Sequence, residues 1–472
     1  MSAVKKPKIN RIVSLDLMRG WFLVIIILDH LSYFPNGLVF ISGDSRLYVT
    51  AAEGFFIISG LVLGIVRGAK LTERSFRYAA KLIWRRSFML YLTSIIITIL
   101  SIAIGWHFVG NDGVKSPLPP LDSNIFSLFW RIVTLQEFYG WADYLRLYAI
   151  FLALTPAALW LLRRGKWYIV LTVSTLVWLL TPKPVNEFTQ PFTWQFIFFI
   201  AFTLGFYSPQ IKSWWNSLSA KTRRRTKTVI FTLFIITFIA NVFAEFFAPA
   251  LNDNLSTAIN NFRPILAASF DKLALTPARV AMSLLWFIGF FMIFQRFEKQ
   301  IKAFEENPNL IMVGTNILEK NTEFTAFKTV PEKTEEIREY SKFRNPFNNP
   351  SSMMKKEYIL KVGNYRKFRY LEDYDLTMRL IHDNPTKDFL NIQEPLVIMQ
   401  TNNSSYLRRG GLLYVKTEFF LQADFYRRGY ISKVELCRNI FIRNIVRVMP
   451  NSMRKLIYKK KMRERVEVKS TI

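Results

Sequence analysis

Long apolar runs dominate the chain up to about residue 295, and mixed apolar and polar positions follow. Eight of these runs are predicted to be membrane-spanning helices: 13–34, 48–66, 87–106, 144–162, 167–181, 193–207, 228–247 and 277–295. Most reach the roughly 17–25 residues that cross hydrocarbon with every backbone amide bonded inside the helix. The runs at 167–181 and 193–207 are short for this. Segment 124–140 carries Arg131 and Glu137, which favours an interfacial helix.

The pattern after residue 295 is typical of an α/β protein. It predicts a polar amphipathic helix at 296–310, a strand at 311–320, and a loop, strand, helix and turn over 344–365. A further helix is expected at 371–383, where acidic residues at the start favour a helix N-terminus. The predicted architecture is an α-helical integral membrane bundle of about eight spans (1–295), followed by a partial α/β domain (296–472).

Composition and charge exclude several other classes of protein. The 472 residues are 51% apolar, which is too many for a disordered chain or a simple nucleic-acid binder. The net charge of +29 is explained by basic loops that face anionic lipid, so no nucleic-acid partner is expected. Cys437 is the only cysteine, which excludes an internal disulfide, and three scattered histidines give no metal-ligand spacing. No metal site is therefore predicted.

Lysine and arginine are distributed unequally between the two sides of the predicted bundle. The connections 1–12, 67–86, 163–166 and 208–227 hold about 20 of them, and the connections 35–47, 107–143, 183–192 and 248–276 hold about 6. Because positive loops stay on the cytosolic side, the N-terminus is predicted to be cytosolic. An even number of spans then makes the C-terminus cytosolic too. We expect a multi-pass protein of the cytoplasmic (inner) membrane, without a cleaved signal peptide.

The ionisable side chains of the first span include Asp16, Arg19 and His30. Arg19 and His30 are 11 residues apart, three helical turns, so they share one face about 16 Å apart. Asp16 can pair with Arg19 three residues away, which would lower the cost of burial. The residue types alone leave two interpretations open. Either the pair belongs to a functional site, or Arg19 and His30 reach the two headgroup regions.

Several motifs in this portion resemble the membrane acyltransferase-3 superfamily. They are the Arg19-x10-His30 pair, Glu53-Gly-Phe-Phe-Ile-Ile-Ser-Gly60, and Trp84-Arg85-Arg86 at the third span. The resemblance covers about residues 11–294 and is nearest to the OpgC-like branch, which is associated with succinylating periplasmic glucans. Members of the superfamily have about ten spans, so the last helices of the bundle are expected to be missing here.

The resemblance implies acyl transfer to a hydroxyl of an envelope glycan. His30 would take the proton of the acceptor hydroxyl, since histidine titrates where a base is useful. Arg19 would hold an anionic donor, expected to be acyl-CoA, with help from Arg85 and Arg86. Glu53 would orient His30 or contact substrate. No permanently bound cofactor is expected, and the partners would be the lipid bilayer and a glycan acceptor.

The second portion resembles the distal half of a family 2 glycosyltransferase of GT-A fold, over about residues 296–461. The motifs are Arg344-Asn-Pro-Phe347, Gly363-Asn-Tyr365 and Glu372-Asp-Tyr-Asp-Leu376. The resemblance implies that Asp373, paired with Glu372, deprotonates the acceptor, that Arg344 and Asn345 line the site, and that Arg408 and Arg409 meet a diphosphate. Asn349 stands where the family often has histidine, so that acceptor contact is altered. The alternative for Glu372 and Asp373 is an ordinary helix N-terminal charge.

The half of a GT-A enzyme that holds the nucleotide sugar and its divalent metal is missing upstream of residue 296. Asp373-Tyr374-Asp375 matches the DxD pattern formally, but it belongs to the helix motif and is not expected to bind metal. A nucleotide sugar would bind only if a second chain supplied the missing half. At the C-terminus, segment 431–465 interleaves apolar and basic residues. It is either a helix that lies on anionic lipid or a terminal helix packed on the domain.

Three hypotheses about function follow. The first is membrane-bound acyl transfer to a glycan, with succinyl as one candidate group. The second is a membrane-tethered family 2 glycosyltransferase. The third is a fusion of two incomplete enzymes with little activity, produced by recombination or by a misread gene. The third is motivated by both resemblances breaking near residues 294–296.

Overall fold

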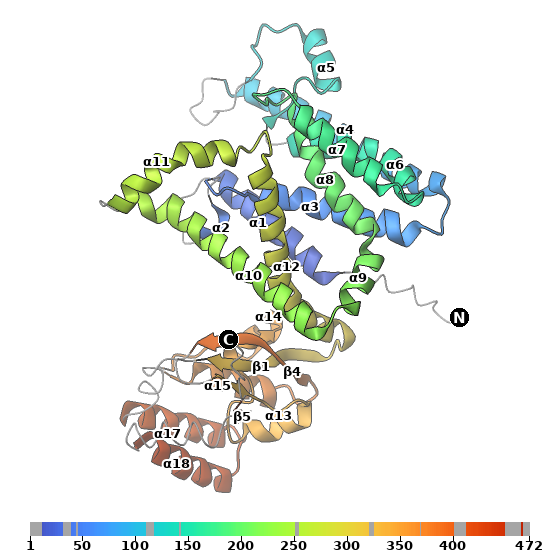
Figure 1. Cartoon of the computed structure of the whole chain (residues 1–472). Coiled ribbons are helices and arrows are strands. Elements are labelled where there is room, and N and C mark those ends of the chain that lie inside the picture. The colour runs from blue at the N-terminus through green and yellow to red at the C-terminus, as the bar shows by residue number, and fades with distance from the viewer. Residues whose placement is uncertain are drawn as a thin grey trace. The chain divides into compact units, whose positions relative to one another are not determined.

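The structure of the protein is a computed structural model. It describes residues 12–31, 39–43, 46–109, 118–140, 143–250, 254–320, 325–368, 370–400, 412–448 and 464–465. The chain divides into two compact units, Met1–Phe294 (unit 1) and Gln295–Ile472 (unit 2). One helix, α12 (Pro277–Glu306), runs through the boundary without a break (Figure 1).

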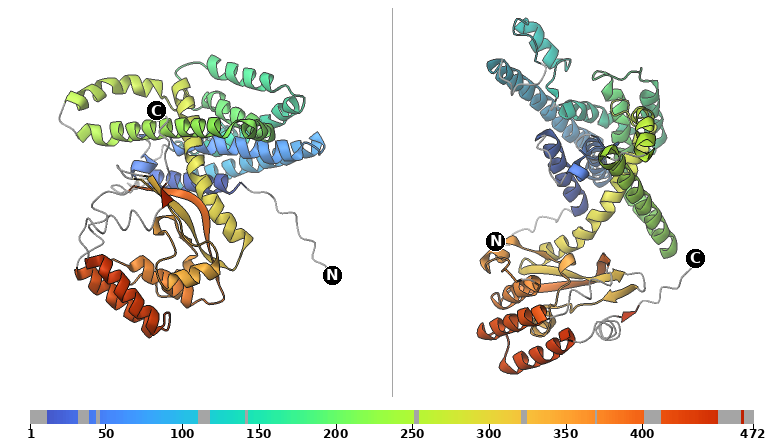
Figure 2. Two further views of the ribbon diagram at one scale, coloured as in Figure 1. Left: turned by 60° about the horizontal axis from the view of Figure 1, so that its bottom comes forward. Right: turned by 90° about the vertical axis from the view of Figure 1, so that its left-hand side faces the viewer.

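Unit 1 is helical throughout its regular structure. Its helices are α1 (Val13–Leu31), α2 (Val39–Ser42), α3 (Ala51–Leu63, continued by turns to Leu71), α4 (Phe76–His107), α5 (Ile125–Val133), α6 (Asp143–Arg163), α7 (Trp167–Leu180), α8 (Gln190–Phe206), α9 (Ser208–Ser217), α10 (Ala220–Val242, continued to Ala250), α11 (Asn254–Ser269) and the first part of α12. Each of the eight predicted spans coincides with one of these helices. Figure 2 shows them from two further directions.

Five of the helices in the described residues are long and apolar enough to cross a membrane. They are Ala51–Leu71, Phe76–His107, Asp143–Arg163, Ala220–Phe247 and Pro277–Glu306. The other three predicted spans are α1, which has 19 residues and three charged side chains, α7, which has 14 residues, and α8, which has 17. The two shortest are the two that the sequence marked as short.

Some connections are more ordered than the sequence predicted. Residues 248–276 were expected to be a connection, but they contain the 16-residue helix α11. The predicted interfacial helix at 124–140 is the nine-residue α5, and Arg131 at its end forms an ion pair of 2.7 Å with Glu137. A short amphipathic helix and a loop can show the same mixture of apolar and polar residues, so the sequence pattern alone does not distinguish them.

Helices α3 and α8 pack at backbone contact, because glycines face each other across the seam. A Cβ atom on Gly60 would lie 2.4 Å from the carbonyl oxygen of Phe198, and one on Gly64 would lie 2.2 Å from that of Phe202. On the facing helix, a Cβ on Gly205 would lie 2.2 Å from the carbonyl oxygen of Leu61. Small residues are the usual means by which membrane helices approach so closely.

Unit 2 is a mixed sheet covered by helices. Its elements are β1 (Leu310–Lys320), β2 (Thr325–Lys328), α13 (Thr334–Ser341), a short turn (Asn349–Ser351), β3 (Met353–Met354), α14 (Lys356–Lys361), α15 (Glu372–His382), β4 (Asp388–Gln400), α17 (Leu412–Arg427), α18 (Lys433–Val448) and β5 (Glu464–Arg465). The strand at 311–320, the helix at 371–383 and the succession over 344–365 agree with these bounds.

The sheet is organised around β1. Strands β2 and β3 pair with it antiparallel, and β4 pairs with it parallel along its whole length. Strand β5 lies next to β2 and pairs with it antiparallel. Helix α15 packs on this sheet through Leu376 and Leu380, and it packs on α17 through Tyr374 and Met378. Helix α15 therefore lies between the sheet and the C-terminal helices, which fixes the direction of its first turn.

We expect Gly64→Ala to destabilise unit 1 by about 1–3 kcal/mol, because the added methyl group must displace the backbone of α8. Gly20→Ala is the matched control, since a Cβ at Gly20 meets nothing within 4 Å. Thermal unfolding of the detergent-solubilised chain, followed by tryptophan fluorescence, measures both. Equal unfolding temperatures for the two variants would contradict the packing described.

Candidate functional site

Helix α1 places its apolar residues in the core and its ionisable residues on the other side. Leu15, Met18, Phe22 and Ile25 are buried, whereas Arg19 and His30 are exposed. The ring nitrogen Nδ1 of His30 lies 2.6 Å from the carbonyl oxygen of Ile26 one turn earlier. The expected ion pair between Asp16 and Arg19 is not among the described contacts. The charge of Arg19 acts instead on Tyr148, which belongs to the helix α6.

Polar groups on four helices interact electrostatically around Tyr148 of α6. Ser59 on α3, Arg86 on α4 and Arg19 on α1 each act on its hydroxyl group. We call Arg19, Ser59, Arg86 and Tyr148 the membrane cluster. Two guanidinium groups beside two hydroxyl groups form a suitable environment for an anionic ligand. The sequence singled out Arg19 and Arg86, but it assigned no role to Tyr148.

Arg85 does not join the membrane cluster. It lines an open hollow on the surface of α4, with Arg77, Lys81 and Trp84 among its neighbours. The indole nitrogen of Trp84 donates to the carbonyl oxygen of Ala153 on α6, at 3.2 Å. Adjacent residues on a helix point about 100° apart, so Arg85 and Arg86 cannot serve one small site in the same way.

Glu53 is fully buried and forms an ion pair with Arg279 of α12. The distance from Nε of Arg279 to Oε1 of Glu53 is 2.5 Å. The other carboxylate oxygen of Glu53 accepts hydrogen bonds from the backbone nitrogen and the hydroxyl of Thr50, at 2.9 and 2.7 Å. The expectation that Glu53 orients His30 is therefore wrong, because its contacts go to Arg279 and Thr50. A buried carboxylate needs a cation, and this requirement was the available signal for Arg279.

The segment 270–275, just before α12, has irregular backbone and side-chain donors that bond its carbonyl oxygens. These donors are Arg279 to Phe270 (2.8 Å), Trp194 to Lys272 (3.1 Å), Thr193 to Leu273 (2.7 Å) and Trp178 to Leu275 (3.0 Å). Irregular backbone at membrane depth is tolerated only when its polar groups are satisfied by protein or by water. The segment is thus held in one conformation by α7, α8 and α12.

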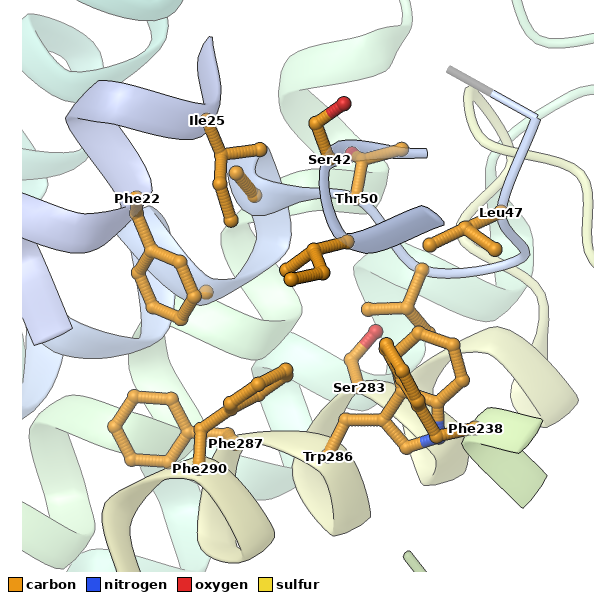
Figure 3. A pocket seen from close by; sticks show the side chains of 14 residues that line it. Phe22, Ile25, Ser42, Leu47, Thr50, Phe238, Ser283, Trp286, Phe287 and Phe290 are labelled. Atoms are coloured by element: carbon orange, nitrogen blue, oxygen red, sulfur yellow. The ribbon is translucent and has the colours of Figure 1, made fainter. Parts of the chain in front are cut away.

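An apolar cavity lies between α1, α3, α10 and α12, lined by Phe22, Phe238, Trp286 and Phe290 among others (Figure 3). Its volume is about 30 Å³. Ligand pockets usually measure roughly 300–1,000 Å³, so this cavity holds no more than a water molecule or two. It is a packing gap and not a substrate site.

In unit 2, Asp373 occupies the first turn of α15 in a half-buried position. Burial raises the pKa of its carboxyl group, the charge of Glu372 adds to this effect, and hydrogen bonds from the backbone of Tyr374 and of Asp373 oppose it. The amide of Asn345 lies 3.4 Å from Oδ2 of Asp373, and Lys328 is close enough to act on its charge. Glu372 is exposed. A carboxylate with a raised pKa is a suitable general base.

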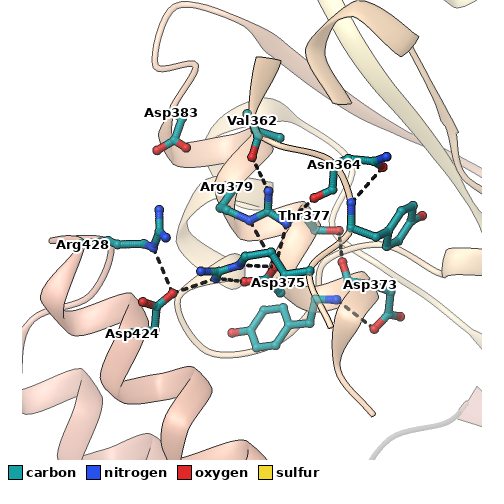
Figure 4. A network of polar contacts seen from close by, with 12 residues as sticks. Val362, Asn364, Asp373, Asp375, Thr377, Arg379, Asp383, Asp424 and Arg428 are labelled. Carbon is teal, nitrogen blue, oxygen red and sulfur yellow. Dashed lines mark hydrogen bonds and ion pairs between the residues drawn. The ribbon is translucent and has the colours of Figure 1, made fainter. Parts of the chain in front are cut away.

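The next carboxylate, Asp375, is bound on both sides by arginine (Figure 4). It is fully buried and forms ion pairs with Arg366 and Arg379, the latter at 2.7 Å. Arg366 continues the network to Asp424 at 2.7 Å, and Asp424 binds Arg428 at 2.9 Å. Asp375 therefore anchors α15. Its carboxylate oxygens bind the guanidinium groups of Arg366 and Arg379.

Of the other residues predicted for the site in unit 2, the structure describes Arg344 and Asn349. Arg344 is half-buried, near Asn345. Asn349 is exposed, whereas its neighbour Asn348 is buried and donates to the carbonyl oxygen of Thr315 at 3.0 Å. Arg408 and Arg409 lie outside the described residues.

The C-terminal helix α18 is packed on the domain. Arg443 forms an ion pair of 3.0 Å with the buried Glu418 of α17, and Asn439 donates to the carbonyl oxygen of Lys342 at 2.8 Å. The structure favours the packed-helix interpretation over the described part of segment 431–465.

A sequence model of the OpgC protein family matches residues 11–320. The chain belongs to the OpgC family. The match continues past the boundary expected at about residue 294, through α12 to the end of β1. OpgC-family membership accounts for unit 1 as a membrane protein with several spanning helices.

The C-terminal part of this OpgC-family chain is similar to known glycosyltransferases. It is 40% identical over 136 residues to the Escherichia coli UDP-Gal:alpha-D-GlcNAc-diphosphoundecaprenol beta-1,3-galactosyltransferase, covering 29% of this chain and 48% of that protein. It is 26% identical over 171 residues to the amylovoran biosynthesis glycosyltransferase AmsE of Erwinia amylovora, covering 35% and 62%. The chain thus spans about half to under two thirds of these relatives. No solved structure matches. Together the comparisons support a glycan-modifying enzyme.

We expect Glu53→Gln to destabilise unit 1 by about 3–5 kcal/mol, because it leaves the Arg279 guanidinium buried without its counterion. The double variant Glu53→Gln/Arg279→Gln should be less destabilised than the sum of the two single variants. A double-mutant cycle of unfolding free energies in detergent measures this coupling. If the unfolding free energies lost in the two single variants add up to the loss in the double variant, Glu53 and Arg279 have no energetic coupling.

Unit 2 should lose stability as pH falls through the range in which His382 titrates. Burial, with the charges of Arg338 and Lys342, lowers the pKa of His382 from 6.5 to about 4. The folded state therefore favours neutral His382, and its stabilisation, about 2–3 kcal/mol, is complete above pH 6.5 and lost towards pH 4. Hydrogen exchange of α15 peptides in the full chain measures it. His382→Phe keeps the stacking on Tyr430 and should flatten the profile.

Proposed function

We propose that the chain transfers an acyl group, with succinyl as the first candidate, from acyl-CoA to a hydroxyl of an envelope glycan. The observation that carries the proposal is the membrane cluster, in which the charges of Arg19 and Arg86 and the hydroxyl group of Ser59 act on Tyr148 in the membrane unit of an OpgC-family chain. Arg19 and Arg86 are exposed on α1 and α4, so both guanidinium groups are accessible to an anionic ligand and can bind it through charge-assisted hydrogen bonds.

The residues divide between donor and acceptor. Arg19 and Arg86 hold the anionic donor, and Arg85 contacts it from the hollow on α4. His30, three turns along α1 from Arg19, takes the proton of the attacking hydroxyl. The new ester C–O bond forms as the thioester C–S bond breaks, and the thiolate leaves as the free thiol after it takes up a proton. The donor and the acceptor therefore approach opposite ends of α1.

The Lys and Arg bias of the connections supports an inner-membrane location with both termini in the cytosol. In that orientation Arg19 lies nearer the cytosol, where acyl-CoA is made, and His30 lies nearer the outer face, where envelope glycans are modified. The lipid bilayer and the glycan acceptor are the partners of this reaction.

His30→Ala and Arg19→Ala should each lower acyl transfer by about 100-fold, since each removes a group that acts on the reacting atoms or on the donor. His107→Ala is the matched control, because His107 is an exposed histidine at the end of α4. Glycan acylation is measured by mass spectrometry in membranes that contain equal amounts of each chain. Transfer at the parent rate by His30→Ala would exclude the proposed base.

A membrane-tethered glycosyltransferase is the second candidate, and the position of Asp373 favours it. The half-buried carboxylate lies near Asn345, its pKa is raised, and Asp375 anchors its helix. The nucleotide-binding half expected of such an enzyme does not precede unit 2 in this chain, so a second chain would have to provide it. If neither activity is found, the third hypothesis, a fusion of two incomplete enzymes, remains, and the DNA sequence across codons 294–296 tests it.

Calorimetric titration of the full chain with a UDP-sugar or dTDP-sugar and Mn²⁺ should show no binding, because the carboxylates and backbone that would hold a nucleotide diphosphate are not encoded before unit 2. Saturable binding that is lost on chelation of the metal would favour the glycosyltransferase. Asp373→Asn would serve as the control in that case, since a base contributes to turnover and not to nucleotide binding.

A further inference from the structure

A second group of charged residues lies at the end of unit 1 where α3, α6, α8 and α12 begin. It comprises Glu53, Asp143, Arg146, Glu187, Lys272 and Arg279, and we call it the charged rim. Arg279 pairs with Glu53, and Arg146 pairs with Asp143 at 2.6 Å. Arg146 also donates to the carbonyl oxygen of Glu187 at 2.8 Å, and Arg279 donates to that of Phe270, two residues before Lys272, at 2.8 Å. The charge of Lys272 acts on both Glu53 and Asp143, which links the two ion pairs.

The charged rim passes from buried to exposed. The side chain of Glu53 is 0% exposed and that of Arg279 is 5% exposed, whereas Asp143 is 19% exposed. Lys272 and Glu187 are exposed. A ligand that enters from the exposed side would meet Lys272 and Glu187 first and the buried Glu53–Arg279 ion pair last.

Hydrogen-bonding capacity in the charged rim is left unused. Nη2 of Arg279 is buried and has no acceptor among the described residues. Both contacts of Arg146 with Asp143 go to Oδ1, and Oδ2 has no described donor. Lys272 makes no hydrogen bond or contact ion pair through its ammonium group within the described part of the chain. A buried donor without a partner is unfavourable, so an unused one at a site calls for a ligand.

The unused groups match the chemistry of a sugar hydroxyl, which both donates and accepts. Lys272 and Arg279 offer donors, and Asp143 and Glu187 offer acceptors. The three carboxylates and three cations of the charged rim sum to zero formal charge, so it does not select an anion. Next to Asp143, Tyr144 exposes 44% of its surface, which provides an aromatic face of the kind that lines ligand sites.

The segment that carries Lys272 is held firmly enough to position it. The carbonyl oxygen of Lys272 itself accepts from Trp194, and those of Phe270 and Leu273 are bonded by Arg279 and Thr193. A lysine on such a backbone loses less entropy on binding than one on a free loop.

We propose that the charged rim is the acceptor subsite and binds a neutral hexose unit of the glycan. The proposal rests on the proposed function, because it assigns the acceptor of that reaction. Lys272 is its specificity-determining residue, and Arg279 and Asp143 complete its donor and acceptor set.

The test is saturation-transfer NMR on the full chain in nanodiscs, with a neutral gluco-oligosaccharide as the probe. Lys272→Met should weaken binding about tenfold, as expected for loss of a hydrogen bond to a charged group. Lys166→Met is the matched control, because Lys166 is an exposed lysine between α6 and α7, and it should bind as the parent does. Equal thermal unfolding of the two variants shows that folding is unaffected.

Two results would overturn the proposal. One is unchanged binding by Lys272→Met. The other is displacement of the neutral probe by inorganic phosphate or an oligohexuronate at lower concentration than by the probe itself, which would make the charged rim an anion site.

Failure of the acceptor subsite and failure of the acyl-transfer reaction give different experimental results. Acyl transfer that persists in Lys272→Met with the parent's acceptor KM refutes the subsite and leaves the reaction intact. Lys272-dependent sugar binding without any acyl transfer supports the subsite and refutes the reaction. His30→Ala should lose transfer but keep binding of the oligosaccharide.

Discussion

Water cannot solvate charges or backbone amides inside a membrane, so a buried charge in a spanning helix is stabilised by a partner in the protein. The Glu53–Arg279 pair is the plainest result of this constraint, since it joins the start of α3 to the start of α12. The same guanidinium group bonds the carbonyl oxygen of Phe270 and so fixes the irregular segment before α12. Arg279 therefore shares the positioning of Lys272 with Thr193 and Trp194, whose side chains bond the next carbonyl oxygens of the segment.

The elements that follow from local pattern could be predicted. Apolar runs of sufficient length identified all eight helices, and the acidic start of α15 with its buried leucines identified that helix and its direction. Such features depend on neighbouring residues within a few turns, so one sequence contains the whole signal.

The contacts that join distant parts of the chain could not be predicted. Glu53 and Arg279 are 226 residues apart, and no local pattern relates them. A spacing of three residues allowed Asp16 to pair with Arg19, but the charge of Arg19 acts on Tyr148, which comes from another helix. Of the two neighbouring asparagines in the motif, Asn348 is buried and Asn349 is exposed. A motif match compares residue order and does not report which side chain points inwards.

The two chemistries suggested by the chain are confined to different units. The membrane cluster and the charged rim belong to unit 1, and Asp373 with its arginine-anchored neighbour Asp375 belongs to unit 2. The OpgC match nevertheless runs through α12 and β1, so the family similarity does not stop where the compact unit does. A substitution in one unit can therefore be interpreted for one reaction at a time.

The exposed thiol on α18 has a practical consequence. Cys437 is the chain's single cysteine and is accessible, and all twelve tryptophans precede residue 287. A maleimide dye would therefore attach at one position in unit 2, while the intrinsic indole emission arises from unit 1 alone. The two parts of the chain carry separate optical reporters without any engineering, so their melting can be followed independently in the same sample.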